Sequence, residues 1–103
     1  MEMKQIREFR IEIYGRVQGV NFRVMVREHC DKLGLKGYAM NREAGSVLLV
    51  VQGEGKEIDS LICWIKENPG MSKVDKVIVE EKDLGGEDEE FKGFEIVRGF
   101  IGR

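Results

Sequence analysis

Two glycines and two arginines between Gly15 and Arg23 have the types and spacing of an anion-binding turn. Glycine lets the backbone bend and lets its N–H groups come close to a ligand. Arg23 falls in the first turn of a predicted helix, where the N–H groups lack partners and the helix dipole is positive. Such a turn can hold phosphate. The same residues also suit an ordinary strand-to-helix turn with solvated arginines, and their spacing alone favours neither interpretation.

Two better-known phosphate loops are excluded by the sequence. Gly55 and Lys56 are followed by Glu57, so there is no Gly-x-x-x-x-Gly-Lys-Ser/Thr motif, and there is no Gly-x-Gly-x-x-Gly motif. A phosphate site at the turn would therefore belong to another class.

The elements on both sides of the turn can be predicted from apolar spacing. Phe9, Ile11 and Ile13 alternate with charged residues, which indicates a strand over about residues 5–14. The apolar spacing after the turn predicts a helix over about residues 22–33, with Asn21 as its N-cap. Gly34 is placed to end this helix in a Schellman motif.

The rest of the chain completes an α+β pattern. We expect strands near residues 37–42, 47–51, 74–81 and 94–96, a helix near 58–65, an acid-rich loop at 84–90 and a tail at 98–103. The order βαββαβ with one extra strand is the ferredoxin-like split βαβ plan, in which two helices cover one face of an antiparallel sheet. We expect one domain over residues 1–103 with its core at about 5–97, and Val77 and Val79 facing inward. The fold alone says nothing about chemistry, because it hosts many functions.

Two ordered motifs resemble the signatures of the acylphosphatase family. The first is the turn, Gly15-Arg16-Val17-Gln18-Gly19-Val20-x-Phe22-Arg23. The second is a strand with its following turn, Gly37-Tyr38-Ala39-Met40-Asn41-x-x-x-Gly45-Ser46-Val47. The resemblance extends over about residues 7–97.

The resemblance implies a hydrolase that cleaves the carboxyl–phosphate bond of acyl phosphates. We expect no cofactor, and no metal either, because the sequence shows no cluster of metal ligands and an arginine can supply the positive charge. The resemblance implies that Arg23 and Asn41 are catalytic. It also implies a phosphate-binding loop that is made of Gly15, Arg16, Val17, Gln18, Gly19, Val20 and Asn21. For Arg16, a solvated position is favoured over direct contact with the phosphate.

The chemistry of Arg23 and Asn41 fits that reaction. The leaving group is a carboxylate whose acid has a pKa of about 4, so its departure needs little help from a proton donor. The reaction does need positive charge on the phosphoryl oxygens and a water held in line with the breaking bond. An arginine supplies the charge, and a carboxamide can orient the water because it both donates and accepts hydrogen bonds. Without the resemblance, Asn41 would be interpreted as the start of an ordinary hairpin turn.

Two positions depart from the family pattern. Asn21 stands where the family usually has glycine or a larger apolar residue, and its N-cap role should make it tolerated. Ala44 stands where the family often has aspartate, which could loosen the turn beside Asn41 but removes no catalytic group.

Other candidate residues are interpreted as structural. His29 is the only histidine and lies at the apolar stripe of the first helix, and Trp64 is expected to pack from the second helix. Cys30 and Cys63 are too far apart for a Cys-x-x-Cys motif, so we expect buried, free thiols. The acidic cluster at residues 87–90 lacks the alternating ligands of a calcium loop.

Composition limits the partners. The 103 residues carry a net charge of −2, which gives no overall attraction to nucleic acid. The beginning of the chain lacks the apolar segment of a secretory signal, and no long apolar run follows, so we expect a cytoplasmic protein without a membrane span. We expect a monomer that acts on a small acyl phosphate.

A second function remains open at the level of the sequence. The chain could be a non-catalytic module that binds a phospho-ligand or regulates a partner on the same fold. An RNA-binding role is disfavoured, because the strands lack paired exposed aromatic residues. Acylphosphatase-like units also occur at the front of larger carbamoyl-transferring maturation proteins, a role for which this chain would need a partner.

Overall fold

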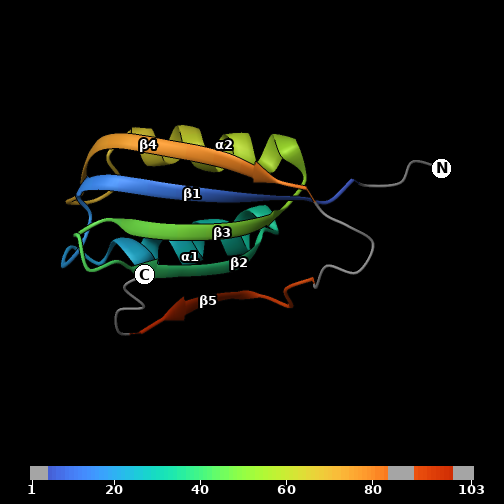
Figure 1. The fold of residues 1–103 in the computed structure, drawn as a ribbon, viewed down its shortest axis with the longest axis horizontal. Coiled ribbons are helices and arrows are strands. Elements are labelled where there is room, and N and C mark those ends of the chain that lie inside the picture. The colour runs from blue at the N-terminus through green and yellow to red at the C-terminus, as the bar shows by residue number, and fades with distance from the viewer. Residues whose placement is uncertain (1–4, 84–89, 99–103) are drawn as a thin grey trace.

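The structure is a computed structural model and describes residues 5–83 and 90–98. Its elements follow the predicted βαββαβ order with an additional final strand (Figure 1). They are β1 (Arg7–Arg16), α1 (Phe22–Leu33), β2 (Lys36–Asn41), β3 (Val47–Gly53), α2 (Gly55–Lys66), β4 (Lys73–Lys82) and β5 (Phe94–Val97).

The strands form one sheet in the order β4-β1-β3-β2-β5, and both helices lie on one face of it (Figure 1). The β1–β3, β1–β4 and β2–β3 pairs are antiparallel, as the ferredoxin-like plan predicts. β5 instead pairs parallel to β2, so the sheet is mixed and not wholly antiparallel as expected. The parallel pairing places the C-terminal end of β5 beside the C-terminal end of β2.

The core lies between the sheet and the helices. Ile11 and Ile13 of β1 are fully buried there, and Phe9 packs against the same core, as the alternating pattern predicts. β3 is buried along its whole length because β1 and β2 flank it, which explains its continuous apolar sequence.

α1 begins and ends at the predicted residues. Gly34 adopts a left-handed conformation with φ 73°, and its N–H bonds to the carbonyl of Asp31. The N–H of Leu35 donates to the carbonyl of Cys30 at 2.9 Å, and the Leu35 side chain is buried. These two bonds and the buried leucine make up the predicted Schellman motif.

The packing corrects three predictions. Val77 is partly buried, but Val79 is 40% exposed, because β4 is an edge strand that α2 covers incompletely. Cys30 is buried as expected, whereas Cys63 is exposed, because it lies on the outward side of α2. β1 extends to Arg16, two residues beyond its predicted end, because its last residues pair with the start of β4.

Two predictions fall wholly or partly outside the described residues. The acid-rich loop is described only at Glu90, and of the predicted tail the structure describes Arg98 alone. Among the described residues, no helix is both long enough and apolar enough to span a membrane.

Candidate active site

The N-terminal end of α1 presents free backbone donors beside Arg23. The first bond of the helix runs from the N–H of Met25 to the carbonyl of Asn21 at 3.2 Å. Within the described part of the chain, the backbone N–H groups of residues 18–24 donate no hydrogen bond. The N–H groups at the start of α1 form the positive end of the helix dipole, so this position suits an anion.

Arg23 is held over this end of α1 by the last strand of the sheet. Its Nη1 donates to the backbone carbonyl of Val97 at 2.9 Å, and the side chain is partly buried. This bond uses one N–H of the guanidinium and leaves the others for a ligand. β5 therefore orients the arginine that the sequence predicts to be catalytic.

Asn41 is the last residue of β2 and carries a polar atom without a partner. Its Oδ1 is buried and accepts no hydrogen bond within the described residues. An orphaned buried carbonyl costs about 1–3 kcal/mol of stability relative to a satisfied one. Such an atom at the end of a strand is explained if it accepts a hydrogen bond from a ligand or water in the working protein.

These groups converge on one pocket of about 220 Å³. Five residues predicted from the sequence line it, together with four that were not predicted. The predicted ones are Val17, Gly19, Asn21, Arg23 and Asn41, and the others are Phe22, Val24, Ile96 and Arg98. Among the described residues, the two ionisable ones that line it are both arginines, so the pocket is suited to an anion.

Gln18 connects the loop to the hairpin between β2 and β3. Its Nε2 donates to the carbonyls of Arg42 and Ser46, both at 2.8 Å. The hairpin is also closed by the N–H of Arg42, which donates to the carbonyl of Ser46. The side chain of Gln18 therefore fixes the loop relative to Asn41 and does not line the pocket, and Ala44 leaves the hairpin closed.

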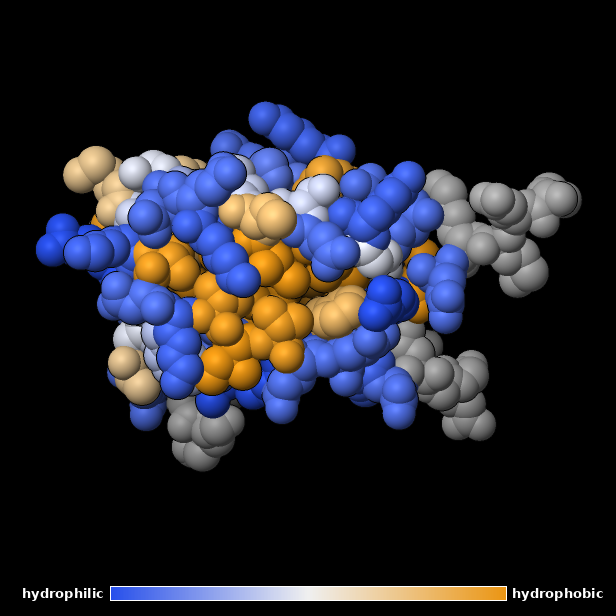
Figure 2. Space-filling view, turned by 90° about the horizontal axis from the view of Figure 1, so that it is seen from above, coloured by the Kyte–Doolittle hydropathy of each residue, from blue (hydrophilic) through white to orange (hydrophobic). Residues whose placement is uncertain are grey.

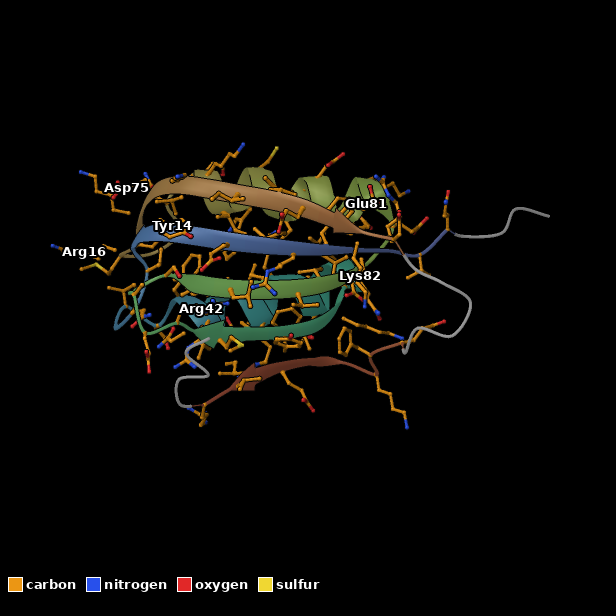
Figure 3. The ribbon with its side chains drawn as sticks, viewed as in Figure 1. Tyr14, Arg16, Arg42, Asp75, Glu81 and Lys82 are labelled. Carbon is orange, nitrogen blue, oxygen red and sulfur yellow. The ribbon has the colours of Figure 1, made fainter. Side chains whose placement is uncertain are left out.

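Three other predicted loop residues also lie outside the pocket lining. Gly15 and Arg16 belong to β1 and pair with β4, and a Cβ at Gly15 would collide with the carbonyl oxygen of Lys73. The Arg16 side chain is exposed and extends outward from the end of β1 (Figure 3), in agreement with the solvated position favoured for it. Val20 packs against the hydrophobic core.

Asn21 corrects the prediction of a side-chain N-cap. Its φ of 62° is left-handed, and its side chain makes no capping hydrogen bond. Glycine adopts this conformation without steric cost, and asparagine is one of the few other residues that tolerate it. The asparagine is therefore compatible with a position where the family usually has glycine, but for this reason and not as a cap.

Arg98 is the functional candidate that the sequence pattern missed. It directly follows β5, and the parallel register pairs Met40 with Val97, so the next step places Arg98 beside Asn41. The sequence does show a basic residue directly after the final strand. This residue can be assigned to the site only once β5 is known to pair parallel with β2.

The remaining chemical groups are structural. His29 and Trp64 stack with ring centroids 4.2 Å apart, and burial followed by the Lys32 charge lowers the pKa of His29. Burial raises the pKa of the Cys30 thiol to about 12, which keeps it protonated and unreactive. No cluster of metal-ligating side chains is found among residues 5–83 and 90–98.

The sequence model of the acylphosphatase family matches residues 9–96 of this chain. The chain belongs to the acylphosphatase family. It is 42% identical to an acylphosphatase from Acaryochloris marina over 84% of this chain and 88% of the relative. It is 38% identical to an acylphosphatase from Rubrobacter xylanophilus over 90% of this chain and 82% of that one.

Solved structures agree with this family membership. The acylphosphatase of Bacillus subtilis is 34% identical, with a TM-score of 0.80 over 91% of this chain and all of that one. Full-length HypF, solved in a phosphate- and nucleotide-bound form, is 37% identical with a TM-score of 0.84. The match covers 97% of this chain but only 13% of HypF, so it concerns one unit of that larger protein.

Proposed function

We propose that this acylphosphatase hydrolyses small acyl phosphates in the pocket between the turn, β2 and β5, with Arg23 and Asn41 as its catalytic residues. The observation that carries this proposal is that Arg23 converges on one pocket with the N–H groups of residues 18–24 and the Oδ1 of Asn41, and these last two have no partner in the described part of the chain. A non-catalytic binding module would need the donors and the arginine, but it would not account for a buried acceptor beside an anion site. The binding-module function is therefore not favoured.

In the proposed mechanism the phosphoryl group lies against the N–H groups of residues 18–24 and the free N–H groups of Arg23. These donors stabilise the charge that spreads over the phosphoryl oxygens in the transition state. Val17, Gly19 and Asn21 of the loop line the pocket, and Gln18 holds the loop in place from outside the pocket.

Asn41 positions the nucleophile. Its Oδ1 accepts a hydrogen bond from a water molecule whose oxygen attacks phosphorus opposite the leaving group. The P–O bond to the acyl group breaks, its electron pair leaves with the carboxylate, and the proton of the water is released to solvent. Because the carboxylate is a weak base, no acid is needed to protonate it.

The charge of Arg23 takes the place that a metal ion has in many other phosphoryl transfers, so we propose a reaction without metal or cofactor. The pocket volume suits a small substrate. We also propose that the protein works in the cytoplasm and does not bind nucleic acid. The free thiols and the net charge of −2 support these two proposals.

The test is phosphate release from benzoyl phosphate by the wild type, Arg23→Ala and Arg23→Lys. Arg23→Ala should lower turnover by a factor on the order of 10³–10⁵, by comparison with arginines in other phosphoryl transfers. Arg23→Lys should not restore it, since an ammonium keeps the charge but loses the planar fork of donors. Loss of the bond to Val97 should lower the free energy of unfolding by about 1 kcal/mol.

Arg16→Ala is the matched control, because Arg16 belongs to the same motif but points away from the pocket. It should keep turnover within a few-fold of wild type. Wild-type turnover in a folded Arg23→Ala variant would exclude this site.

A further inference from the structure

The outer edge of β4 is an exposed pairing surface. β4 ends the sheet, ten residues long and without proline, and no other strand in the described part of the chain pairs with its outer side. An edge of this kind presents a row of backbone N–H and C=O groups that can pair with another chain.

The side chains along this edge include apolar ones at its centre. Val79 is 40% and Ile78 is 39% exposed, and Val77 is partly buried against the core. Figure 2 looks onto the side of the molecule that β4 and α2 form, and it shows an apolar area bordered by polar side chains. Val77 and Val79 lie opposite the core residues Ile13 and Ile11 of β1, so both are on the helix side of the sheet.

We propose that a second copy of this chain pairs with β4, antiparallel and with the two Ile78 residues opposite each other. In this register Val77 of each chain lies opposite Val79 of the other, which joins the two apolar areas on the helix side. Lys76 of each chain lies opposite Glu80 of the other, which gives two ion pairs on the open face. The sequence of β4 is thus complementary to itself in both charge and hydropathy, and the two sheets become one continuous sheet.

Neighbouring registers that keep side chains on matching faces are worse. If Val77 lay opposite itself, Lys76 would face Ile78 and its charge would lose its partner. If Val79 lay opposite itself, Lys76 would face Lys82 and Val77 would face Glu81. Both alternatives place charges against apolar or like-charged groups at the centre of β4, whereas the proposed register does so only towards its ends, and such mismatches destabilise a cross-strand pair.

Two residue pairs in the proposed register are unfavourable, Asp75 with Glu81 and Val74 with Lys82, and both lie towards the ends of β4. Two features reduce the effect of the first pair. Asp75 lies where the register of β4 against β1 shifts, so regular pairing ends there. The Glu81 carboxylate is already paired with both Nε and Nη2 of Arg7 at 2.8 Å. Asp75 and Glu81 lie at opposite ends of β4 (Figure 3).

The dimer would leave the proposed active site open. β4 and β5 are the two opposite edges of the sheet, and β5 contributes to the pocket while β4 does not. This inference therefore does not depend on the proposed function, and it replaces the monomer expected from the sequence. The short regular pairing indicates a weak dimer, since small interfaces belong to transient complexes.

Sedimentation velocity over a range of about 10 µM to 1 mM tests the inference, a range suited to a weak interface. The single variants are Lys76→Glu and Glu80→Lys, and the key sample is their equimolar mixture. Each variant alone turns two cross-chain attractions into two repulsions, and this should raise the dissociation constant about tenfold or more. In the mixture, each heterodimer joins a chain with two acidic positions to a chain with two basic ones, so association should return to the wild-type level.

Lys32→Glu is the matched control, a charge reversal at an exposed position of α1 away from β4. It should dimerise as the wild type does, and all variants should keep the wild-type melting temperature within a few degrees. Phosphate release per chain should be unchanged in Lys76→Glu, which separates this test from that of the proposed function. A wild type that stays monomeric at the highest concentration, or a mixture that associates no better than its components, would overturn the proposal.

Discussion

Asn41→Ala should increase stability while it removes most of the activity. The buried Oδ1 of Asn41 has no partner within the described residues, and an unsatisfied buried carbonyl costs about 1–3 kcal/mol. Alanine removes this cost but also removes packing atoms, whose loss costs about 1 kcal/mol. The net expectation is a gain between about 0 and 2 kcal/mol in the free energy of unfolding.

A gain of this size can be measured by thermal unfolding. One kcal/mol corresponds to about 4–8 °C in the melting temperature of a domain of this length, so thermal unfolding can resolve the gain. Turnover should fall by a factor on the order of 10²–10³, the cost of losing one preorganised group. Inhibition by inorganic phosphate should change little, because the donors of the loop and Arg23 are untouched.

Asn68→Ala is the matched control at a satisfied asparagine. The Oδ1 of Asn68 accepts the N–H of Val74 at 2.8 Å, and its φ of 57° is left-handed. The control should therefore lose stability and keep turnover, the reverse of Asn41→Ala. If Asn41→Ala instead melted several degrees lower and kept its turnover, the unpartnered oxygen would not be retained for catalysis and the water-positioning role would be refuted.

Three more predictions follow from the site and the thiols. Arg98→Ala should raise KM for benzoyl phosphate by about tenfold with a smaller effect on kcat, because Arg98 lines the pocket but, within the described residues, makes no bond like the one that orients Arg23. An unchanged KM would remove it from the site. Activity should survive EDTA, and a loss that a divalent ion restores would contradict the metal-free mechanism. In the native protein at pH 8, iodoacetamide should alkylate the exposed Cys63 quickly and Cys30 hardly at all, because Cys30 is buried and its pKa is raised to about 12. In denaturant both thiols should react, and mass spectrometry distinguishes one alkylated cysteine from two.

The local elements could be predicted from the sequence because each depends on few neighbours. α1 has an apolar stripe and a glycine that can end it in a left-handed turn, and both signals lie within its own residues. β3 could be recognised as central from its continuous apolar run. Family membership could be predicted because two motifs in the right order are specific, and the match to residues 9–96 confirms it.

Other features could not be predicted because they depend on pairings between distant segments. The extension of β1 to Arg16 depends on β4, and the exposure of Val79 depends on how far α2 covers the sheet edge. Arg98 joins the pocket only through the parallel pairing of β5 with β2. The role of Gln18 depends on a hairpin more than twenty positions away in the chain, so its side chain could be assigned to the phosphate loop but not to the contact it makes.

The pocket lies where the fold leaves polar groups unsatisfied, and this gives a physical reason for its position. Within the described residues, the N–H groups at the start of α1 have no protein acceptor and the buried Oδ1 of Asn41 has no partner. The unsatisfied Oδ1 and the left-handed Asn21 each cost stability in the free protein. A bound phosphoryl group and its water would satisfy the donors and the acceptor together, so the free energy of binding offsets the cost. Gln18 keeps these groups together in the absence of a ligand, because it ties the loop to the hairpin that follows Asn41. The site is therefore preorganised by contacts outside the pocket, and the groups inside remain free for the substrate.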